Sequence, residues 1–266
     1  MAGAAVWIGG YLSGLPPNEI KIYLTSLAVS LFCGSGNAFN DFMDVESDRV
    51  SHPARPLPSG KLKMYSAVLT TITLSLFSLI AAAFVSPVIF VITVLLHLLL
   101  FLYCVILKKI ILVGNLVVAL AGAMPFIMGG LVAGSEALAA LPGVRIAALF
   151  AFVFHFGREL VKDMADLEGD QKAGLKTLPG VISSGNFMWL VSIIMALLIG
   201  LTLIPLFFDW YRLFYGVVVV FMVDIPLIYV ILYLWLSGAD KRFKIAGSIF
   251  KLLMLFGLIA FIGGKI

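Results

Sequence analysis

Long apolar runs, separated by short polar or proline- and glycine-containing segments, recur along the whole chain. A helix needs about 20 apolar residues to cross the hydrocarbon core of a bilayer. The runs predict helices over about residues 1–14 (partial), 22–43, 64–86, 88–107, 110–134, 141–162, 182–207, 211–236 and 243–264. The pattern therefore predicts an all-α, polytopic membrane protein of nine transmembrane helices, the first of them truncated.

Composition agrees with this prediction, because 62% of the 266 residues are hydrophobic and only 12% are charged. These fractions exclude a soluble protein, and we expect one membrane domain over residues 1–266 with membrane lipids around it and no nucleic-acid partner. Cys33 and Cys104 lie in apolar runs and are expected to be packing residues. The first 14 residues lack the basic region of a cleavable signal peptide and resemble the end of a longer span.

Positive charges are divided unevenly between alternate connections of the predicted helices. The connections after the second, fourth, sixth and eighth helices hold 13 cations: Arg49, Arg55, Lys61, Lys63, Lys108, Lys109, Arg158, Lys162, Lys172, Lys176, Lys241, Arg242 and Lys244. The opposite side holds only Lys21, Arg145, Arg212 and Lys265. Because cytoplasmic loops carry the excess of Lys and Arg, the first set is predicted to be cytoplasmic and the C-terminus external.

Acidic residues gather in two segments that resemble each other. The sequence NDFMDVESD (residues 40–48) is followed by PARPLPSG (53–60), and DMADLEGD (163–170) is followed by LPG (178–180). The same spacings separate the three aspartates of each segment, which are Asp41, Asp44 and Asp48 in the first and Asp163, Asp166 and Asp170 in the second. Four predicted helices lie between the two motifs, so both are expected on the cytoplasmic side, as in a parallel internal repeat.

The chemistry of these motifs favours a bound cation. On a helix, each motif presents one acidic face, which Asn40 extends in the first and Glu159 in the second. A charge at the centre of a lipid-exposed helix costs about 3 kcal/mol, so the acids must line a wet cavity or the cytoplasmic mouth. Mg²⁺ is the natural partner, because it prefers carboxylate and amide oxygens and bridges to phosphates. The alternative is a solvated helix end whose acids pair with Arg49, Arg158 and Lys162.

Basic and aromatic residues near the motifs complete a candidate phosphate site. Arg55 and Lys176 follow the two motifs, Lys172 closes the second, and Lys108 ends the fourth helix near Tyr103. Such cations would grip a phosphate-rich ligand from several directions. For Lys108 and its neighbour Lys109, a topology signal is the alternative interpretation.

Other polar residues in the apolar helices are weaker candidates. Asp224, two residues before Pro226, either positions a substrate or pairs with Lys251, and we favour structural pairing. His155, one turn before Glu159, either assists an acceptor hydroxyl or forms an interhelical hydrogen bond, which we favour. His97 is assigned to packing. The glycines of the fifth helix, Gly122, Gly129, Gly130 and Gly134, would let helices approach closely.

The two motifs resemble those of the UbiA-type intramembrane prenyltransferases. The family's NDxxDxxxD, followed by PxRPLPSG, is similar to residues 40–48 and 53–60, and its DxxDxxGD is similar to residues 163–170. The YxxxLK ending of the fourth helix also resembles the family, although Tyr103 is offset by one position. Residues that the family places before Met1 have no counterpart in this sequence.

The resemblance implies a central cavity in which two Mg²⁺ ions bind a prenyl diphosphate. It implies metal ligands and catalytic groups among Asn40, Asp41, Asp44, Asp48, Glu159, Asp163, Asp166 and Asp170, of which Asp44, Asp48, Asp166 and Asp170 are expected to be catalytic. It also implies diphosphate binding by Arg55, Tyr103, Lys108, Lys172 and Lys176. The metals and cations would stabilise the departing pyrophosphate while an acceptor attacks the allylic carbon.

The acceptor is harder to predict than the donor. Details around both motifs resemble the branch of the family that makes archaeal ether lipids, which implies a geranylgeranyl diphosphate donor and a geranylgeranylglyceryl phosphate acceptor. A 4-hydroxybenzoate-like aromatic acceptor of quinone synthesis is the alternative. Outside the family, a transporter is the main rival, yet transporter sites lie near the midplane, whereas these acids lie at one membrane face. A membrane alcohol phosphotransferase is disfavoured, because its DG-to-AR linkage is absent.

Overall fold

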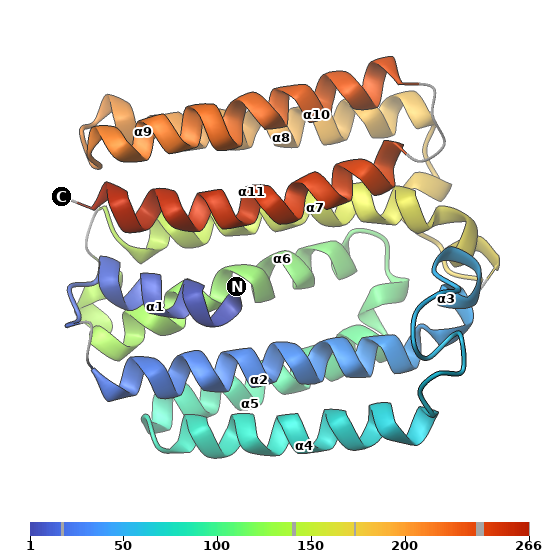
Figure 1. Ribbon diagram of the computed structural model, residues 1–266, viewed down its shortest axis with the longest axis horizontal. Helices are drawn as coiled ribbons and strands as arrows, with labels where there is room; N and C mark the ends of the chain where they lie inside the picture. The colour runs from blue at the N-terminus through green and yellow to red at the C-terminus, as the bar shows by residue number, and fades with distance from the viewer. Residues whose placement is uncertain (17–18, 140–141, 173, 238–241, 266) are drawn as a thin grey trace.

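The computed structural model of the protein describes residues 1–16, 19–139, 142–172, 174–237 and 242–265. Regular structure within these ranges is entirely helical, and the long helices run side by side (Figure 1). Two expectations fall outside the described residues. These are the cytoplasmic cation Lys241 and residue 141, where the predicted sixth helix begins.

The first half of the bundle contains six α-helices. They are α1 (Ala2–Leu12), α2 (Ile20–Met43), α3 (Val45–Ser51), α4 (Met64–Ala83), α5 (Pro87–Val105) and α6 (Val113–Ala133). Short 3-10 helices, η1 (Leu107–Lys109) and η2 (Ser135–Leu138), precede and follow α6. Local sequence sets the start of α5, because Pro87 occupies its first turn and the Ser86 hydroxyl accepts a hydrogen bond from the Ile89 N–H at 3.2 Å.

The second half contains α7 (Val144–Lys172), η3 (Leu178–Gly180), α8 (Ser184–Phe207), α9 (Leu213–Val219), the π-helix η4 (Val220–Asp224), α10 (Ile225–Leu236) and α11 (Arg242–Gly264). The α9–η4–α10 run is continuous apart from this π-turn. Pro226, the second residue of α10, lacks the N–H that would bond one turn back, which accounts for the change of helical pitch.

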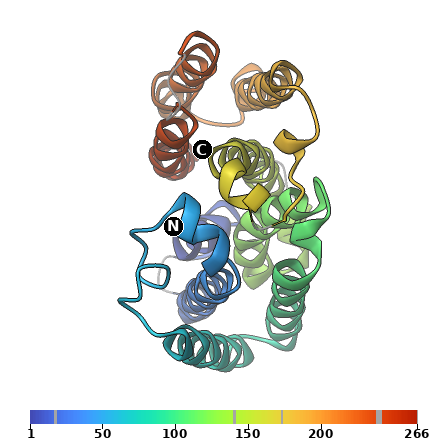
Figure 2. The same cartoon turned by 90° about the vertical axis from the view of Figure 1, so that its right-hand side faces the viewer.

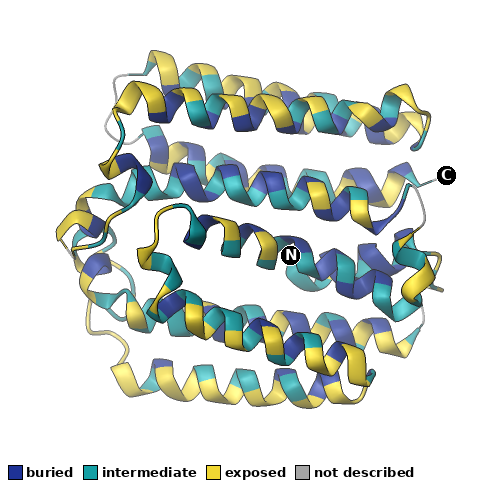
Figure 3. Ribbon diagram, turned by 180° about the vertical axis from the view of Figure 1, so that it is seen from behind, coloured by how far each residue is buried: buried dark blue, intermediate teal, exposed yellow. Residues whose placement is uncertain are grey.

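Within the described residues, seven helical segments are long and apolar enough to cross a membrane: α2, α4, α5, α6, α8, the α9–α10 run and α11. Large apolar side chains such as Leu69, Ile72 and Leu76 are exposed on the outer helices (Figure 3), as expected of surfaces that face lipid. The chain is therefore an integral membrane protein. The helix α1 has only 11 residues, and α7 has 29 but carries acids along its last part, so nine membrane crossings stay a prediction.

The contact between α1 and α6 depends on two glycines. A Cβ on Gly9 would lie 2.3 Å from the Phe126 carbonyl oxygen, and one on Gly129 would lie 2.0 Å from the Val6 carbonyl oxygen. Any side chain at either position would force the helices apart. The close approach predicted for the glycines of this helix is thus confirmed at Gly129.

Both acidic motifs lie at the same end of the bundle. The end of α2, with α3, and the C-terminal end of α7 meet at the right in Figure 1, and Figure 2 views this end directly. The same end holds η1, which follows α5. At 1.5 Å per residue, α7 is about 44 Å long, so its acidic end extends past a hydrocarbon core of about 30 Å.

Candidate active site

The first acidic motif sits where one helix ends and another begins. The helix α2 stops at Met43, and Asp44, with φ −95° and ψ 5°, links it to α3. The Asn40 amide donates a hydrogen bond to the Asp44 carboxylate at 2.8 Å. Lys108, from η1, forms an ion pair with the other oxygen of the same carboxylate. The break in the helix therefore presents Asp44 to a cation from a separate part of the chain.

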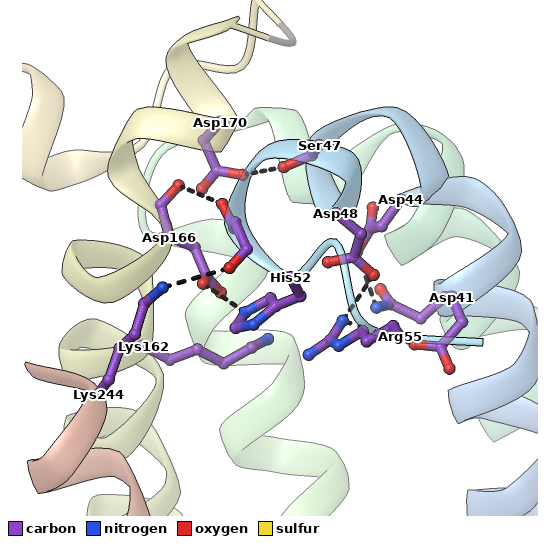
Figure 4. Close-up of polar contacts among 12 residues, drawn as sticks. Asp41, Asp44, Ser47, Asp48, His52, Arg55, Lys162, Asp166, Asp170 and Lys244 are labelled. Atoms are coloured by element: carbon purple, nitrogen blue, oxygen red, sulfur yellow. Dashed lines mark hydrogen bonds and ion pairs between the residues drawn. The ribbon is translucent and has the colours of Figure 1, made fainter. Parts of the chain in front are cut away.

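The proline-rich loop after α3 folds back onto the first motif. Arg55 Nη1 lies 2.6 Å from Asp48 Oδ2 and 3.8 Å from Asp41 Oδ1 (Figure 4). The Asp48 side chain is only 8% exposed, so this ion pair is largely shielded from water. Arg55 thus neutralises the motif that precedes it, in the part of the chain where the sequence predicts diphosphate binding.

The second motif lies on an unbroken helix and meets different partners. Asp163 Oδ2 accepts a hydrogen bond from the Asn115 amide at 2.7 Å, and Asp166 Oδ1 lies 2.8 Å from His52 Nε2. Asp170 Oδ1 accepts a hydrogen bond from the Ser47 hydroxyl at 3.1 Å (Figure 4). Burial raises the pKa of Asp170 above its usual value, while the bond from Ser47 opposes that rise.

A glycine brings the two motifs into contact. A Cβ on Gly169 would lie 2.0 Å from the Ser51 hydroxyl oxygen and 2.9 Å from the Ser47 carbonyl oxygen. Lys244 of α11 holds the other side of α3, donating to the Ser51 carbonyl oxygen at 3.2 Å. The glycine of the DxxDxxGD pattern therefore lets α3 rest directly on α7.

Glu159 has a pairing of its own. This buried carboxylate lies 2.7 Å from Arg158 Nη1 and 3.4 Å from Lys162 Nζ. Arg158 and Lys162 are two of the three cations expected to pair with the acids if the motifs were helix ends without a metal. For Glu159, the structure shows that ion pairing.

One cavity of about 920 Å³ joins these groups. The predicted site residues that line it are Asn40, Asp41, Asp44, Asp48, Arg55, Tyr103, Lys108, Glu159, Asp163, Asp166, Asp170 and Lys176. Away from the acids, the walls are apolar side chains such as Leu100, Phe126 and Phe154. A polar end and an apolar interior thus share one space.

Lys172 is the exception among the predicted site residues. It is exposed, is not part of the cavity wall, and its amino group lies 2.7 Å from the Glu168 carboxylate. Its assignment to diphosphate binding therefore gains no support from this geometry and stays a prediction. The reason is helical spacing, because residues 168 and 172 are one turn apart on a face of α7 that points away from the cavity.

Several residues at the site were not predicted. Each aspartate of the second motif has a partner from another helix. These partners are Asn115 of α6, Ser47 of α3 and His52, which follows the last residue of α3. Asn115 is the one uncharged amide in an otherwise apolar helix, which was the available signal. Ser47 lies inside the first motif and His52 just after it. The sequence pattern assigns roles to the neighbouring acids and prolines and not to these two residues.

The backbone between η1 and α6 is strained. Leu112 has φ 66°, a left-handed conformation that a non-glycine residue adopts at a cost of about 1–3 kcal/mol. It lines the cavity and lies three residues after Lys109, at the start of α6. The turn holds Lys108 over Asp44 while α6 brings Asn115 to Asp163.

The donor set fits a hard divalent cation, although the acids do not form a compact cluster. Among the described residues, no group of three or more His, Cys, Asp or Glu side chains is arranged to hold a metal. Instead, Lys108 and His52 each contact one of the carboxylates, and Arg55 contacts two. Carboxylate and amide oxygens facing one cavity from two motifs are nevertheless the ligands that Mg²⁺ prefers. Metal binding would displace the cations.

The structure places the two weaker candidates, Asp224 and His155, in different surroundings. Asp224 is buried, and its Oδ1 accepts a hydrogen bond from the Thr202 hydroxyl at 3.0 Å, so its pairing is structural but does not involve Lys251. It is not part of the cavity wall. His155 lines the cavity and packs against α6, where a Cβ on Gly122 would lie 2.3 Å from its ring.

Comparison with known proteins agrees with this architecture. Residues 1–256 match the UbiA prenyltransferase family. The digeranylgeranylglyceryl phosphate synthase of Sulfurisphaera tokodaii is 36% identical over 215 residues, covering 80% of this chain and 75% of the relative. The protein of the same name from Methanosarcina barkeri is 32% identical over 277 residues, covering 99% and 93%.

Solved structures share the fold. A structure described as giving insights into digeranylgeranylglyceryl phosphate synthase in membranes is 29% identical, with a TM-score of 0.72 over 98% of this chain and 92% of that one. A UbiA homologue from Aeropyrum pernix K1 has a TM-score of 0.79 at 17% identity, covering 97% and 95%. One from Archaeoglobus fulgidus, bound to GPP and Mg²⁺, has a TM-score of 0.68 at 19% identity, covering 98% and 95%.

Proposed function

Because this chain belongs to the UbiA prenyltransferase family, we propose that it transfers a geranylgeranyl group from geranylgeranyl diphosphate to geranylgeranylglyceryl phosphate, forming an ether lipid precursor. The observation that carries the proposal is the single cavity whose polar end gathers both acidic motifs and whose interior is apolar. The relatives named digeranylgeranylglyceryl phosphate synthase support this acceptor.

The proposed metal ligands are the oxygen donors of the two motifs. Asn40, Asp44 and Asp48 would hold one Mg²⁺, and Asp163, Asp166 and Asp170 the other, with Asp41 and Glu159 at the margins. The A. fulgidus homologue with GPP and Mg²⁺ bound supports this assignment. Bound Mg²⁺ supplies charge stabilisation for the departing pyrophosphate.

The chain's own cations would bind the donor. Lys108, Arg55 and Lys176 line the same cavity, and the first two pair with Asp44 and Asp48, which metal binding would occupy. Released in this way, they would hold the diphosphate oxygens. Charge-assisted contacts of this kind stabilise the leaving group more than the bound substrate, which lowers the barrier.

The reaction exchanges one carbon–oxygen bond for another. The bond between the allylic carbon and the diphosphate breaks, and the electron pair leaves with the pyrophosphate. The acceptor hydroxyl oxygen forms the new ether bond to that carbon, and its proton passes to the departing pyrophosphate. The apolar walls of the cavity would enclose the isoprenoid chain and exclude water from the carbocation-like transition state.

The topology belongs to the same proposal: nine membrane crossings, with the acidic end of the cavity in the cytoplasm. The excess of Lys and Arg at that end supports the orientation. In a variant without Cys33 and Cys104, a cysteine placed at residue 52 should react with a membrane-impermeant maleimide only from the cytoplasmic side. A cysteine at residue 138, at the opposite end, should react only from outside. Cytoplasmic labelling of both positions would contradict the orientation.

The deciding experiment offers the purified protein geranylgeranyl diphosphate with either geranylgeranylglyceryl phosphate or 4-hydroxybenzoate. Products are identified by mass spectrometry, with Mg²⁺ or with EDTA. We expect ether formation with the glyceryl phosphate, release of pyrophosphate, and loss of both in EDTA. Prenylated hydroxybenzoate as the main product would place the chain in the aromatic branch of its family. No release of pyrophosphate with either acceptor would favour a transporter.

A further inference from the structure

Lys251 is a cation in the middle of an apolar helix. It lies nine residues after Arg242, the first residue of α11, and so about 14 Å along the helix axis at 1.5 Å per residue. A charged side chain at such a depth costs about 3 kcal/mol when it faces lipid. Its place in the fold therefore favours a position that faces a cavity open to water or substrate and not the lipid.

That cavity is the one already described. Lys251 is part of its wall, together with Met254 and Leu258 of the same helix. Within the described residues, its amino group has no ion pair or hydrogen bond. Asp224, the candidate partner, is bonded to Thr202 instead. The structure thus holds a lysine without a counter-ion on the wall of a mostly apolar cavity.

His155 of α7 lies at the same level. The rings of Phe154 and Phe250 are in contact, with centroids 5.4 Å apart, and His155 and Lys251 each follow one of these two residues. Both side chains line the cavity. Together they form a second polar level, which we call the inner level.

The inner level is separate from the metal-binding end. His155 precedes Asp163 by eight residues, which is about 12 Å along α7. A diphosphate held at the acids would place its allylic carbon between the two levels. A second substrate that attacks this carbon from within the cavity would then have its own polar group near the inner level.

We propose that Lys251 binds the phosphate group of the acceptor and so makes the enzyme select a phosphorylated acceptor, with His155 contacting the adjacent glycerol oxygens. This inference rests on the proposed function. An ammonium group with no counter-ion on the wall of a mostly apolar cavity gains more from an incoming dianion than one that is already paired. An acceptor without the phosphate would leave that charge unpaired, which is the strongest basis for discrimination by a polar site.

The test compares two acceptors in three variants. Geranylgeranylglyceryl phosphate and its dephosphorylated form, geranylgeranylglycerol, are given to the wild type, Lys251→Met and Lys251→Arg. We expect Lys251→Met to raise KM for the phosphorylated acceptor at least about tenfold, with KM for geranylgeranyl diphosphate changed less than about twofold. Its preference for the phosphorylated acceptor over the dephosphorylated one should fall by a similar factor. Lys251→Arg should keep most of that preference, because the charge remains.

Lys21→Met is the matched control. It makes the same chemical change at an exposed residue in the first turn of α2, outside the cavity wall. It should leave both KM values and the preference unchanged.

The outcomes separate the two proposals. If the wild type forms the ether but Lys251→Met keeps the wild-type preference, or raises KM for both substrates equally, the inference about Lys251 is overturned and the proposed function stands. If the wild type forms no ether with the phosphorylated acceptor, the proposed function falls and this inference falls with it. A thermal melt of each variant shows whether a change in KM comes from loss of the fold.

Discussion

The first acidic motif is held by cations, and the second is held by uncharged donors and an imidazole. Lys108 and Arg55 pair with Asp44 and Asp48 at the junction of α2 and α3. On α7, the aspartates contact an amide, an imidazole and a hydroxyl. Identical spacing of the acids therefore coexists with different electrostatic surroundings.

This difference predicts that the two motifs bind metal in different ways. A metal ion that enters the first motif must displace Lys108 and Arg55, and the displaced cations become free to bind diphosphate. In the second motif, Asn115 and Ser47 can keep their bonds, because a carboxylate has oxygens for a donor and a metal together. We therefore expect metal and donor to bind cooperatively at the first motif, and the second to hold its metal more independently.

The largest effects should follow loss of one carboxylate in each motif. Asp44→Asn and Asp166→Asn should each lower kcat by about 10³-fold or more, since a metal ligand is worth several kcal/mol of transition-state stabilisation. Both variants should stay folded, because neither change alters apolar packing. Activity, Mg²⁺ dependence and Tm are to be measured together. Normal turnover in both variants would refute the metal-site assignment.

A smaller effect should follow loss of the displaced cation. Arg55→Ala should raise KM for the prenyl diphosphate by about tenfold, the value of one charge-assisted contact. The control is Lys172→Ala. It removes a cation that lies close to the second motif in sequence but outside the cavity wall. Steady-state kinetics at saturating Mg²⁺ measure both variants, and KM of the control should stay within about twofold of wild type. Equal effects of the two changes would show that net charge alone matters.

The contact between the motifs can be tested at a glycine. Gly169→Ala should destabilise the protein by about 1–3 kcal/mol, because its Cβ would collide with α3 at Ser47 and Ser51. Gly185→Ala is the control, since its Cβ would meet nothing within 4 Å in α8. Alanine is the better helix former, so the control should be neutral or slightly stabilising. Thermal melts in detergent give the comparison, and a Gly169 variant as stable as wild type would argue against the close contact.

The smallest expected effect concerns a neutral donor. Ser47→Ala removes one hydrogen bond to Asp170 and should cost about 1 kcal/mol of stability, with little change in kcat. A denaturation midpoint and kcat, measured side by side with Asp44→Asn, check this. A loss of activity as large as that of the aspartate variant would mean that the second motif depends on its neutral donors as much as the first depends on its ligands.

Much of the architecture follows from the sequence, because apolar runs and acid spacing are local properties. The runs locate the seven long apolar helices found in the described part of the chain, and the predicted acidic ligands and Arg55 line the cavity. Helix ends are harder to predict. The sequence does not reveal that α2 breaks at Asp44 while α7 continues through the matching residue Asp166.

The partners of the acids could not be predicted, since they depend on tertiary contacts. Asn115 is far from Asp163 in sequence, and no periodic pattern marks a single amide in an apolar helix. Lys172 illustrates the opposite case. It is close to the motif in sequence, but the turn of α7 directs it away from the cavity and toward Glu168.

The glycine contact between α1 and α6 has a consequence for how the protein is made. Gly9 and Gly129, which let the two helices touch, are separated by 120 residues of chain. At about 5–20 residues per second of synthesis, α1 leaves the ribosome roughly 6 to 24 s before its partner is complete. During that interval α2, α4 and α5 enter the membrane, and of these three α2 packs against α1. During biogenesis, α1 therefore packs against α2 first, and its glycine contact with α6 forms only after α6 has been synthesised.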